Sequence, residues 1–456
     1  MKEGMALSDG EDCSDRRRPE EGGIAVCSEP KPGEPGSFAG LTAKPQWHDW
    51  RWQLRNRITS IDQLRQAFPD LRVDRGMVAA AEKFPLAITP YYASLIREFS
   101  GGDPAFQMCV PQGRECFTPA YLRTDPLEED KDMPVAGLVH RYADRALLLA
   151  TSACASYCRY CTRKRVACQT DATISAGQLQ EIRAYLSAHP EIRDVIVSGG
   201  DPLTMPTEAL AHVLATIRSV PTVEVIRIGT RCPAVLPMRV TEELVAMLRG
   251  YHPLYVNTHF NHPVELTAQA AEACTRLADA GIPVGNQTVL LRGVNDDPRV
   301  LEALFRALVR IRVRPYYLFQ CDLVQGTEHF RTPLARGIEV MEYLRGRLSG
   351  LAIPLFVVDA PYGGGKIPVL PNYVVSVSPT HTVLRNFEGM LVTYPEPSDL
   401  DSMPPARTGE PASAESVWGL ATGQASKIEP ANSARKERRR VSRVSADKRP
   451  RRTGVE

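Results

Sequence analysis

The sequence predicts an α/β protein centred on a partial TIM-type barrel of six βα units, (βα)6, with a helical N-terminal extension and a C-terminal segment that carries Lys366. Two observations predict this fold. Short apolar runs, mostly β-branched, alternate with helix-like stretches between residues 145 and 319. Polar residues follow several of these runs directly, where the strands of a parallel barrel carry its functional residues.

The apolar runs are the expected strands, and a loop and then a helix-like stretch follow them. The expected strands are Arg145 to Ala150, Asp194 to Ser198, Val223 to Ile228, Leu254 to Asn257, Pro283 to Leu291 and Arg314 to Phe319. The clearest expected helices are Glu208 to Ser219, Glu242 to Arg249, Ala268 to Ala280 and Leu301 to Val313.

The composition is ordinary for a globular protein, with 43% hydrophobic and 24% charged residues among 456. No apolar run approaches the ~18 residues of a membrane span. The first residues lack the apolar core of a signal peptide, so the chain is expected in the cytoplasm. Because a reducing cytoplasm disfavours disulfides, the eleven cysteines indicate free thiols and metal ligands.

Both ends of the chain are expected to be disordered, because residues 1–44 and 396–456 are poor in large apolar residues. Between them we expect a helical N-terminal region at 45–140, the barrel at 141–330 and a C-terminal region at 331–395. Residues 427–456 hold 11 basic and 4 acidic residues, against 44 and 49 in the rest of the chain. This basic tail could bind nucleic acid through phosphate attraction, but a solvated tail is the preferred interpretation.

Cys154, Cys158 and Cys161 follow the first expected strand with the spacing Cys-x3-Cys-x2-Cys. Three thiolates can hold three irons of a four-iron, four-sulfur (4Fe-4S) cluster, whose fourth iron then stays open for chemistry. The alternative is a zinc site, which needs a fourth Cys or His nearby, and Cys168 is a candidate. No second Cys-x2-Cys pair follows, so zinc is the less favoured interpretation.

Further polar residues end the next expected strands. In the turn from Ser198 to Asp201 the glycines let backbone amides approach a ligand, and Asp201 could accept from an ammonium. Alone, Gly-Gly-Asp is an ordinary turn. Together with the residues that end the next three strands, it indicates a site at one face of the barrel. Those residues are Thr230-Arg231, Asn257-Thr258-His259 and Asn286-Gln287.

Three successive glycines precede Lys366, but Ile367 follows it, so the phosphate-binding P-loop pattern fails. A flexible glycine loop can present an amine that forms a Schiff base with an aldehyde such as pyridoxal 5′-phosphate (PLP). A plain glycine turn is the alternative.

The cysteine spacing resembles the signature of the radical S-adenosylmethionine (SAM) superfamily, in which SAM chelates the open iron. Other segments, in order along the chain from about Trp47 to Pro395, look like the lysine 2,3-aminomutase family. The segments are Asp49–Arg57, Ile88–Tyr92, His140–Arg145, Ser198–Leu203, Ile226–Arg231, Arg314–Tyr317 and Pro361–Tyr373.

This resemblance implies a PLP-dependent radical SAM isomerase that moves an α-amino group to the β-carbon after hydrogen abstraction there. It implies a 4Fe-4S cluster, SAM and PLP as cofactors, and an external electron donor of the flavodoxin or ferredoxin type. The expected reaction interconverts L-lysine and β-lysine, with arginine as the second candidate substrate. A homo-oligomer is expected, and nucleic acid and membrane partners are not.

The resemblance also implies residue roles. Cys154, Cys158 and Cys161 would hold the cluster. The SAM region would comprise Ser198, Gly199, Gly200, Asp201 and His259. Lys366 would be the catalytic lysine that binds PLP, with Tyr142, Arg145 and Gln287 near that cofactor. Arg163 would pair with the substrate carboxylate, and Asp322 and Asp359 would hold the distal ammonium of lysine.

Two departures from the family pattern stand out. Tyr160 lies where the family usually has His between the last two cluster cysteines, so adenine contacts are expected to differ. No cysteine follows Cys321, so the C-terminal cysteines that bind interfacial zinc in some members are absent and no zinc is predicted.

Two interpretations from other classes remain open at this stage. One is an iron-sulfur redox or iron sensor that binds nucleic acid through the basic tail. The other is a PLP enzyme without radical chemistry, a decarboxylase or racemase, against which the cysteine triad argues.

Overall fold

The structure is a computed structural model that describes residues 42, 44–378, 380–396, 418–420 and 422–424. Nearly all of the two terminal segments expected to be disordered, 1–44 and 396–456, lies outside these described residues. The basic run at 435–440 lies outside them as well.

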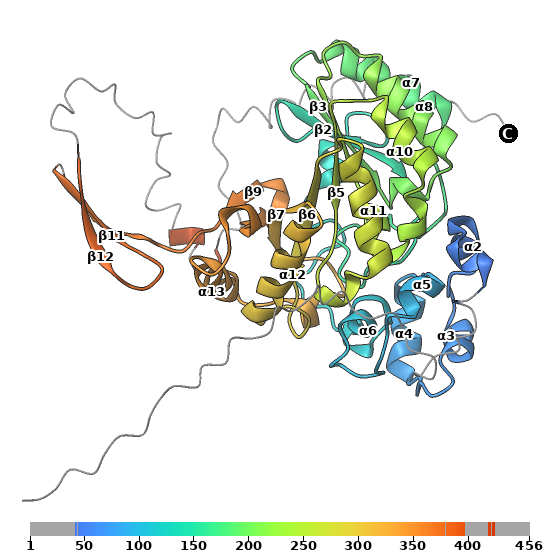
Figure 1. The fold of residues 1–456 in the computed structure, drawn as a ribbon, viewed down its shortest axis with the longest axis horizontal. Helices are drawn as coiled ribbons and strands as arrows, with labels where there is room; N and C mark the ends of the chain where they lie inside the picture. Colours follow the sequence, from blue (N-terminus) through green and yellow to red (C-terminus); the bar gives the residue numbers. More distant parts are fainter. Residues whose placement is uncertain (1–41, 43, 379, 397–417, 421, 425–456) are drawn as a thin grey trace, which may run out of the picture.

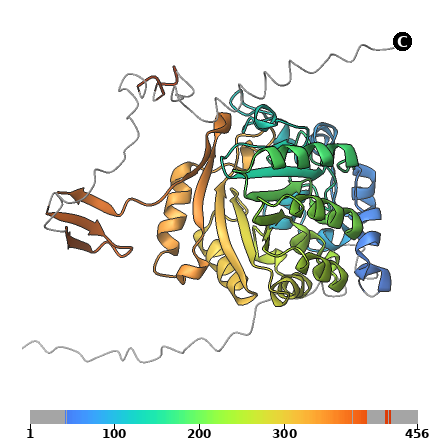
Figure 2. The same ribbon diagram turned by 90° about the horizontal axis from the view of Figure 1, so that it is seen from above.

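One sheet of nine strands, in the order β1 to β9, dominates the described part of the chain. The strands β2 to β8 run parallel, and β1 and β9 pair antiparallel at the two edges. The strands are β1 Leu138–Val139, β2 Arg145–Thr151, β3 Asp194–Gly199, β4 Val225–Gly229, β5 Leu254–Thr258, β6 Val284–Leu290, β7 Val313–Gln320, β8 Leu355–Ala360 and β9 Gly365–Pro368. The curved sheet confirms the predicted partial barrel (Figures 1 and 2).

The six predicted strands correspond to β2 through β7, and β8 adds a further parallel strand. Both β8 and β9 come from the region 331–395, which the sequence analysis kept apart from the barrel. They continue the same hydrogen-bonded sheet. The division of the chain into domains remains a prediction.

Helices line the outside of the sheet and connect its strands (Figure 2). They are α7 Ala176–Ala188, α8 Thr207–Arg218, α9 Cys232–Val235, α10 Glu242–Arg249, α11 Ala268–Asp279, α12 Pro298–Arg310 and α13 Leu334–Leu344. The helix α12 begins three residues earlier than predicted. Its start is set by the side chain of Asp297, which accepts from a backbone N–H of the first turn, and by Pro298 in that turn.

The N-terminal region is helical, and it packs beside the loops that follow the parallel strands (Figure 1). Its elements are η1 Pro45–His48, α2 Trp50–Arg55, α3 Ile61–Ala67, α4 Arg75–Lys83, α5 Pro90–Ala93, α6 Pro104–Cys109, η2 Gly113–Cys116 and η3 Glu129–Asp132. Buried hydrogen bonds join it to the barrel, from Thr89 Oγ1 to the carbonyl of Val235 and between the hydroxyls of Tyr91 and Thr267. This region can therefore position barrel loops.

A separate three-stranded antiparallel sheet projects from the body of the protein (Figures 1 and 2). It consists of β10 Val374–Val377, β11 His381–Arg385 and β12 Leu391–Pro395. Several of its apolar side chains are exposed, including Val377, Leu391 and Tyr394. Among the described residues, no helix is both long enough and apolar enough to span a membrane.

Candidate active site

The three predicted cluster cysteines lie in the loop between β2 and α7, at the carboxyl end of the first parallel strand. This loop is anchored by Arg159, whose side chain is fully buried. Arg159 donates from Nε and Nη2 to the two carboxylate oxygens of Glu115 at 2.9 and 2.8 Å, and from Nη1 to the carbonyl of Pro85. A bidentate pair fixes direction as well as distance. The N-terminal region thus holds the cysteine loop in place.

Two of the thiols face N–H donors. The sulfur of Cys158 accepts from Arg231 Nη1 at 2.8 Å, and that of Cys161 accepts from the backbone N–H of Arg163 at 3.3 Å. Burial, followed by the neighbouring Cys158 thiol, raises the pKa of Cys161 to about 12. Such thiols keep their protons unless a cation replaces them. A metal cation would displace these protons, and Cys154, Cys158 and Cys161 would hold a 4Fe-4S cluster.

The cysteine considered for the zinc alternative lies in the same loop. Cys168 shares a thiol hydrogen bond with Cys154, the largest reason that the pKa of Cys154 is raised and that of Cys168 lowered. Within the described ranges, no three His, Cys, Asp or Glu side chains converge closely enough to hold one metal ion. Thiolates that each bind a different iron of a cluster do not have to converge in this way.

The glycines after β3 serve a different purpose from the one expected. Their amides were predicted to approach a ligand. Instead, the amide of Gly200 donates to the carbonyl of Thr151 at 2.5 Å, and that of Asp201 to the carbonyl of Ala153 at 2.7 Å. A Cβ at Gly199 or Gly200 would lie 2.2 Å from one of these oxygens. Glycine is required because the end of β3 lies directly against the start of the cysteine loop.

The carboxylate of Asp201 is fully engaged by the protein. One oxygen accepts from the amide of Leu203 and the hydroxyl of Thr230, and the other accepts from the amides of Arg231 and Cys232. These donors fill the roughly four lone-pair positions of a carboxylate. The expected contact between this carboxylate and an ammonium stays a prediction, and it would have to compete with these four donors. Asp201 joins the turn after β3 to the residues after β4.

Tyr160, the departure from the family pattern, takes part in a hydrogen-bonded chain. Its hydroxyl accepts from Asn261 Nδ2 at 2.5 Å and lies 3.1 Å from Nε2 of His259. The other ring nitrogen of His259 contacts the carbonyl of Gln287. Burial, and then the charge of Arg231, lowers the pKa of His259 to about 4. The ring is therefore neutral, so Nδ1–H donates to the carbonyl and Nε2 accepts from the tyrosine hydroxyl.

This chain brings the predicted SAM-region residue His259 next to Gln287, which was expected near PLP. His259 lies just after β5 and Ser198 lies near the carboxyl end of β3, whereas Gln287, expected at a strand end, lies in the middle of β6. The predicted SAM-region residues thus lie at the carboxyl ends of their strands, whereas Arg145, expected near PLP, is the first residue of β2.

Lys366 lies opposite a carboxylate at the last edge of the sheet. Its Nζ donates to Asp359 Oδ1 and Oδ2 at 2.7 and 3.0 Å. Its backbone N–H donates to the hydroxyl of Tyr142 at 2.9 Å. The guanidinium of Arg145 lies 3.9 Å from the centre of the Tyr142 ring. Lys366 thus lies next to a phenol that stacks on a guanidinium, and an amine in this surrounding suits an anionic aldehyde cofactor such as PLP.

Arg163 makes a contact that the sequence did not predict. Its Nε lies 3.1 Å from both carboxylate oxygens of Glu129, and its Nη2 lies 2.8 Å from one of them. Glu129 is buried and binds the edge of the guanidinium formed by Nε and Nη2. The N–H groups of Nη1 can therefore donate to another acceptor. The charge of Asp359 also raises the pKa of Arg163, so the two side chains lie near each other.

Asp322 lies near Asp359 as well. Burial, followed by repulsion from Asp359, raises the pKa of the Asp322 carboxyl to about 7, and the nearby Lys366 lowers it in part. Two carboxylates that repel each other in a buried place form a site for a cation. The structure therefore brings together four of the predicted residues, namely Arg163, Asp322, Asp359 and Lys366.

The family models that match the chain are the radical SAM superfamily, over residues 148–304, and lysine-2,3-aminomutase, over residues 341–454. L-lysine 2,3-aminomutase of Acetoanaerobium sticklandii is 48% identical over 409 residues, which cover 88% of this chain and 98% of that protein. The chain belongs to the lysine 2,3-aminomutase family. The enzyme of Clostridium subterminale, of the same description, is 51% identical over 77% of this chain and 85% of its own length.

Members of the lysine 2,3-aminomutase family are isomerases, and the cofactors of this member are a 4Fe-4S cluster, SAM and PLP. As a radical SAM enzyme it acts on a small molecule and takes an electron from an external donor. The family also has relatives of another specificity. Glutamate 2,3-aminomutase of Clostridioides difficile is 42% identical over 78% of this chain and 84% of its own length.

Sequence reasoning missed Glu129, Glu115 and Glu265 in this aminomutase. Each is a buried carboxylate that binds an arginine distant in sequence, and the arginine is buried in two of the three pairs. No local motif marks such a pair. The available signal was indirect, because a basic residue next to a cluster cysteine needs a counter-charge once it is buried.

Proposed function

We propose that this family member interconverts L-lysine and β-lysine, with the pocket of Asp322, Asp359 and Arg163 as its substrate site. The observation that carries this proposal is that two half-buried carboxylates, Asp322 and Asp359, lie close enough to repel each other beside Lys366. A cationic side chain relieves the repulsion between them, whereas the carboxylate of glutamate increases it.

Arg163 supports recognition of the other end of an amino acid. Glu129 binds the guanidinium from the side through Nε and Nη2. The planar fork formed by Nη1 and the remaining N–H of Nη2 matches the two oxygens of an α-carboxylate. The two aspartates would accept from the side-chain ammonium and Arg163 would donate to the α-carboxylate. A basic amino acid would therefore bind in one orientation.

The cluster and SAM, when bound, supply a carbon-centred radical that removes hydrogen from the β-carbon, and PLP supplies the aldehyde to which the migrating nitrogen is attached. The residues of the chain bind and orient the substrate and the cofactors. Lys366 provides the amine that would hold PLP. When that amine is free, its ammonium donates a hydrogen bond to the carboxylate of Asp359.

Anaerobic incubation with SAM, PLP, dithionite and a panel of lysine, arginine and glutamate tests the proposal. Mass analysis is expected to find β-lysine as the main product. The variant Asp322→Asn should turn over lysine far more slowly at low lysine concentration, because its KM rises, while it still binds the cluster and SAM. Asp279→Asn, an exposed surface carboxylate, is the matched control and should keep full activity. If arginine is turned over faster than lysine, arginine is the substrate. If glutamate is turned over faster than lysine, the two aspartates do not form a site for a cation.

We propose that the enzyme works in the cytoplasm, with an electron donor of the flavodoxin or ferredoxin type, and that it forms a homo-oligomer. The projecting sheet β10–β12, with its exposed apolar side chains, supports self-association. Light scattering of the purified holoenzyme tests this, and a monomer at working concentration would contradict it.

A further inference from the structure

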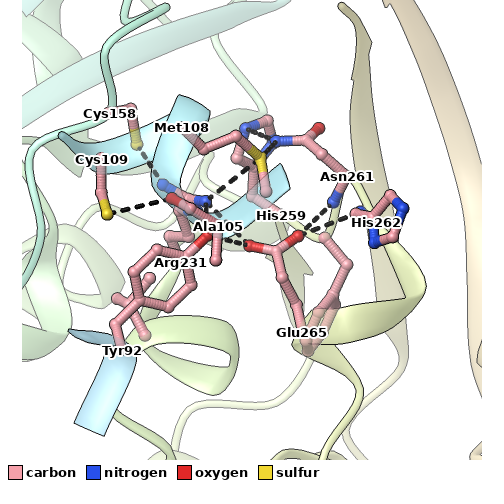
Figure 3. Close-up of polar contacts among 12 residues, drawn as sticks. Tyr92, Ala105, Met108, Cys109, Cys158, Arg231, His259, Asn261, His262 and Glu265 are labelled. Carbon is pink, nitrogen blue, oxygen red and sulfur yellow. Dashed lines mark hydrogen bonds and ion pairs between the residues drawn. The ribbon is translucent and has the colours of Figure 1, made fainter. Parts of the chain in front are cut away.

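A buried ion pair lies against one of the predicted cluster thiols. Arg231 follows β4, and its Nη1 donates to the sulfur of Cys158 at 2.8 Å. Its Nη2 donates to Glu265 Oε1 at 2.8 Å and to the hydroxyl of Tyr92 at 2.9 Å. Figure 3 shows the guanidinium between the thiol on one side and the carboxylate on the other.

This pair cannot turn away from the thiol. The side chain of Glu265 is fully buried, and that of Arg231 is 7% exposed. The second oxygen of Glu265 accepts from the backbone amides of Asn261 at 2.6 Å and His262 at 3.1 Å, and the first also accepts from Tyr92. The carboxylate is thus fixed by the backbone, and it fixes the guanidinium in turn.

The electrostatic consequence concerns the charge of a cluster bound here. A 4Fe-4S cluster on three thiolates carries one net negative charge when oxidised and two after it accepts an electron. A guanidinium that touches a ligand sulfur stabilises the more negative state, and a carboxylate opposes this. Because the guanidinium lies between the sulfur and the carboxylate, its effect is the larger one.

We propose that Arg231 tunes the reduction potential of the cluster through its hydrogen bond to Cys158, and that Glu265 is a positioning residue that limits this effect. The inference rests on the proposed role of Cys158 as a cluster ligand. It does not depend on which amino acid is the substrate. The pair makes the cluster easy enough to reduce for an external donor while keeping the reduced state a strong one-electron reductant.

An anaerobic redox titration of the reconstituted holoenzyme, without SAM and followed by electron paramagnetic resonance, tests the proposal. Mediators and dithionite supply the single electron. At the wild-type midpoint, the ratio of reduced to oxidised cluster should fall about tenfold in Arg231→Met, since hydrogen bonds to charged groups are the stronger ones. The ratio should rise in Glu265→Gln, which removes the opposing charge. Tyr92→Phe removes a neutral contact and is the control with little change.

Shifts in opposite directions distinguish tuning from structural damage, which would move both variants the same way. Equal midpoints in all variants, or shifts of one sign, would overturn the inference. If Arg231→Met does not retain iron, Arg231→Lys takes its place in the comparison. This variant keeps the positive charge, so it should keep most of the wild-type ratio of reduced to oxidised cluster. A lower ratio of reduced to oxidised cluster in Arg231→Lys than in Glu265→Gln supports the proposal. A wild-type ratio in both variants overturns it. A wild-type protein without cluster signal or bound iron would instead refute the ligand assignment itself.

Discussion

Asp359 on β8 and Lys366 on β9 face each other across an antiparallel pair of strands, and the carboxylate binds the ammonium at 2.7 Å. The predicted PLP lysine and a predicted substrate carboxylate are therefore direct partners. One carboxylate can serve two cations in turn, the ammonium of Lys366 when it is free and that of the substrate when Lys366 holds PLP.

Lys366→Ala should remove the absorbance of covalently bound PLP, because Lys366 is the predicted PLP lysine and its backbone N–H is held by the hydroxyl of Tyr142. Borohydride reduction followed by peptide mapping should label Lys366 in the wild type. Asp359→Asn should keep the label and lose lysine turnover, which separates the two roles. Labelling at another lysine would contradict the assignment.

The cysteine loop allows a matched comparison between two neighbouring thiols. Cys154→Ala should lose bound iron and SAM cleavage, whereas Cys168→Gly should keep both. Glycine suits position 168 because its backbone has a positive φ of 56°. Iron content and 5′-deoxyadenosine formation are the measurements. Loss of iron in the Cys168 variant would make Cys168 a ligand and revive the fourth-ligand alternative.

Glu129→Gln should weaken the orientation of Arg163 and raise KM for lysine by about tenfold, since one charge-assisted bidentate contact is lost. Asp130→Asn, a change at the exposed neighbour, should leave KM unchanged. SAM cleavage without lysine should stay at the wild-type rate in both variants. An unchanged KM in Glu129→Gln would mean that Arg163 does not need this partner.

The barrel could be predicted from the sequence because its strands are short apolar runs with polar residues at their carboxyl ends. The seventh parallel strand β8 was overlooked because its residues, including Asp359, were assigned to the lysine segment. The site was predicted less completely. Motifs mark Lys366 and the cysteines, whereas Glu129, Glu115 and Glu265 acquire their roles only when distant segments are buried together.

Asp201 illustrates the same limit. Its position in a Gly-Gly-Asp turn at a strand end indicated a ligand contact, but the competing donors come from residues after β4. Sequence spacing shows that a carboxylate is near the site. It does not show whether the fold has already filled its lone pairs.

The buried group of Glu115, Arg159 and Lys164 should be a main source of stability for the cysteine loop. Arg159 and Lys164 lower the pKa of Glu115 although burial alone would raise it. Glu115→Gln leaves two buried cations without a counter-charge and should cost roughly 3–5 kcal/mol in the free energy of unfolding. Denaturant titration measures this cost. The control Asp130→Asn, at an exposed carboxylate, should lower the free energy of unfolding by about 1 kcal/mol or less. Equal losses in the two variants would contradict the role of Glu115 in anchoring the cysteine loop.

The pH dependence of lysine binding tests the cation pocket most directly. Burial and the neighbouring Asp359 raise the pKa of Asp322 to about 7, so the free enzyme protonates Asp322 as the pH falls through that value. A bound ammonium favours the ionised form and lowers this pKa again, so binding releases a proton below pH 7 and weakens as the pH falls. KM for lysine should therefore rise from pH 8 to pH 6, with a slope approaching about tenfold per pH unit at the acid end. Asp322→Asn should raise KM at every pH and remove this dependence. A wild-type KM that stays constant across the range would show that Asp322 is not the group that meets the substrate cation.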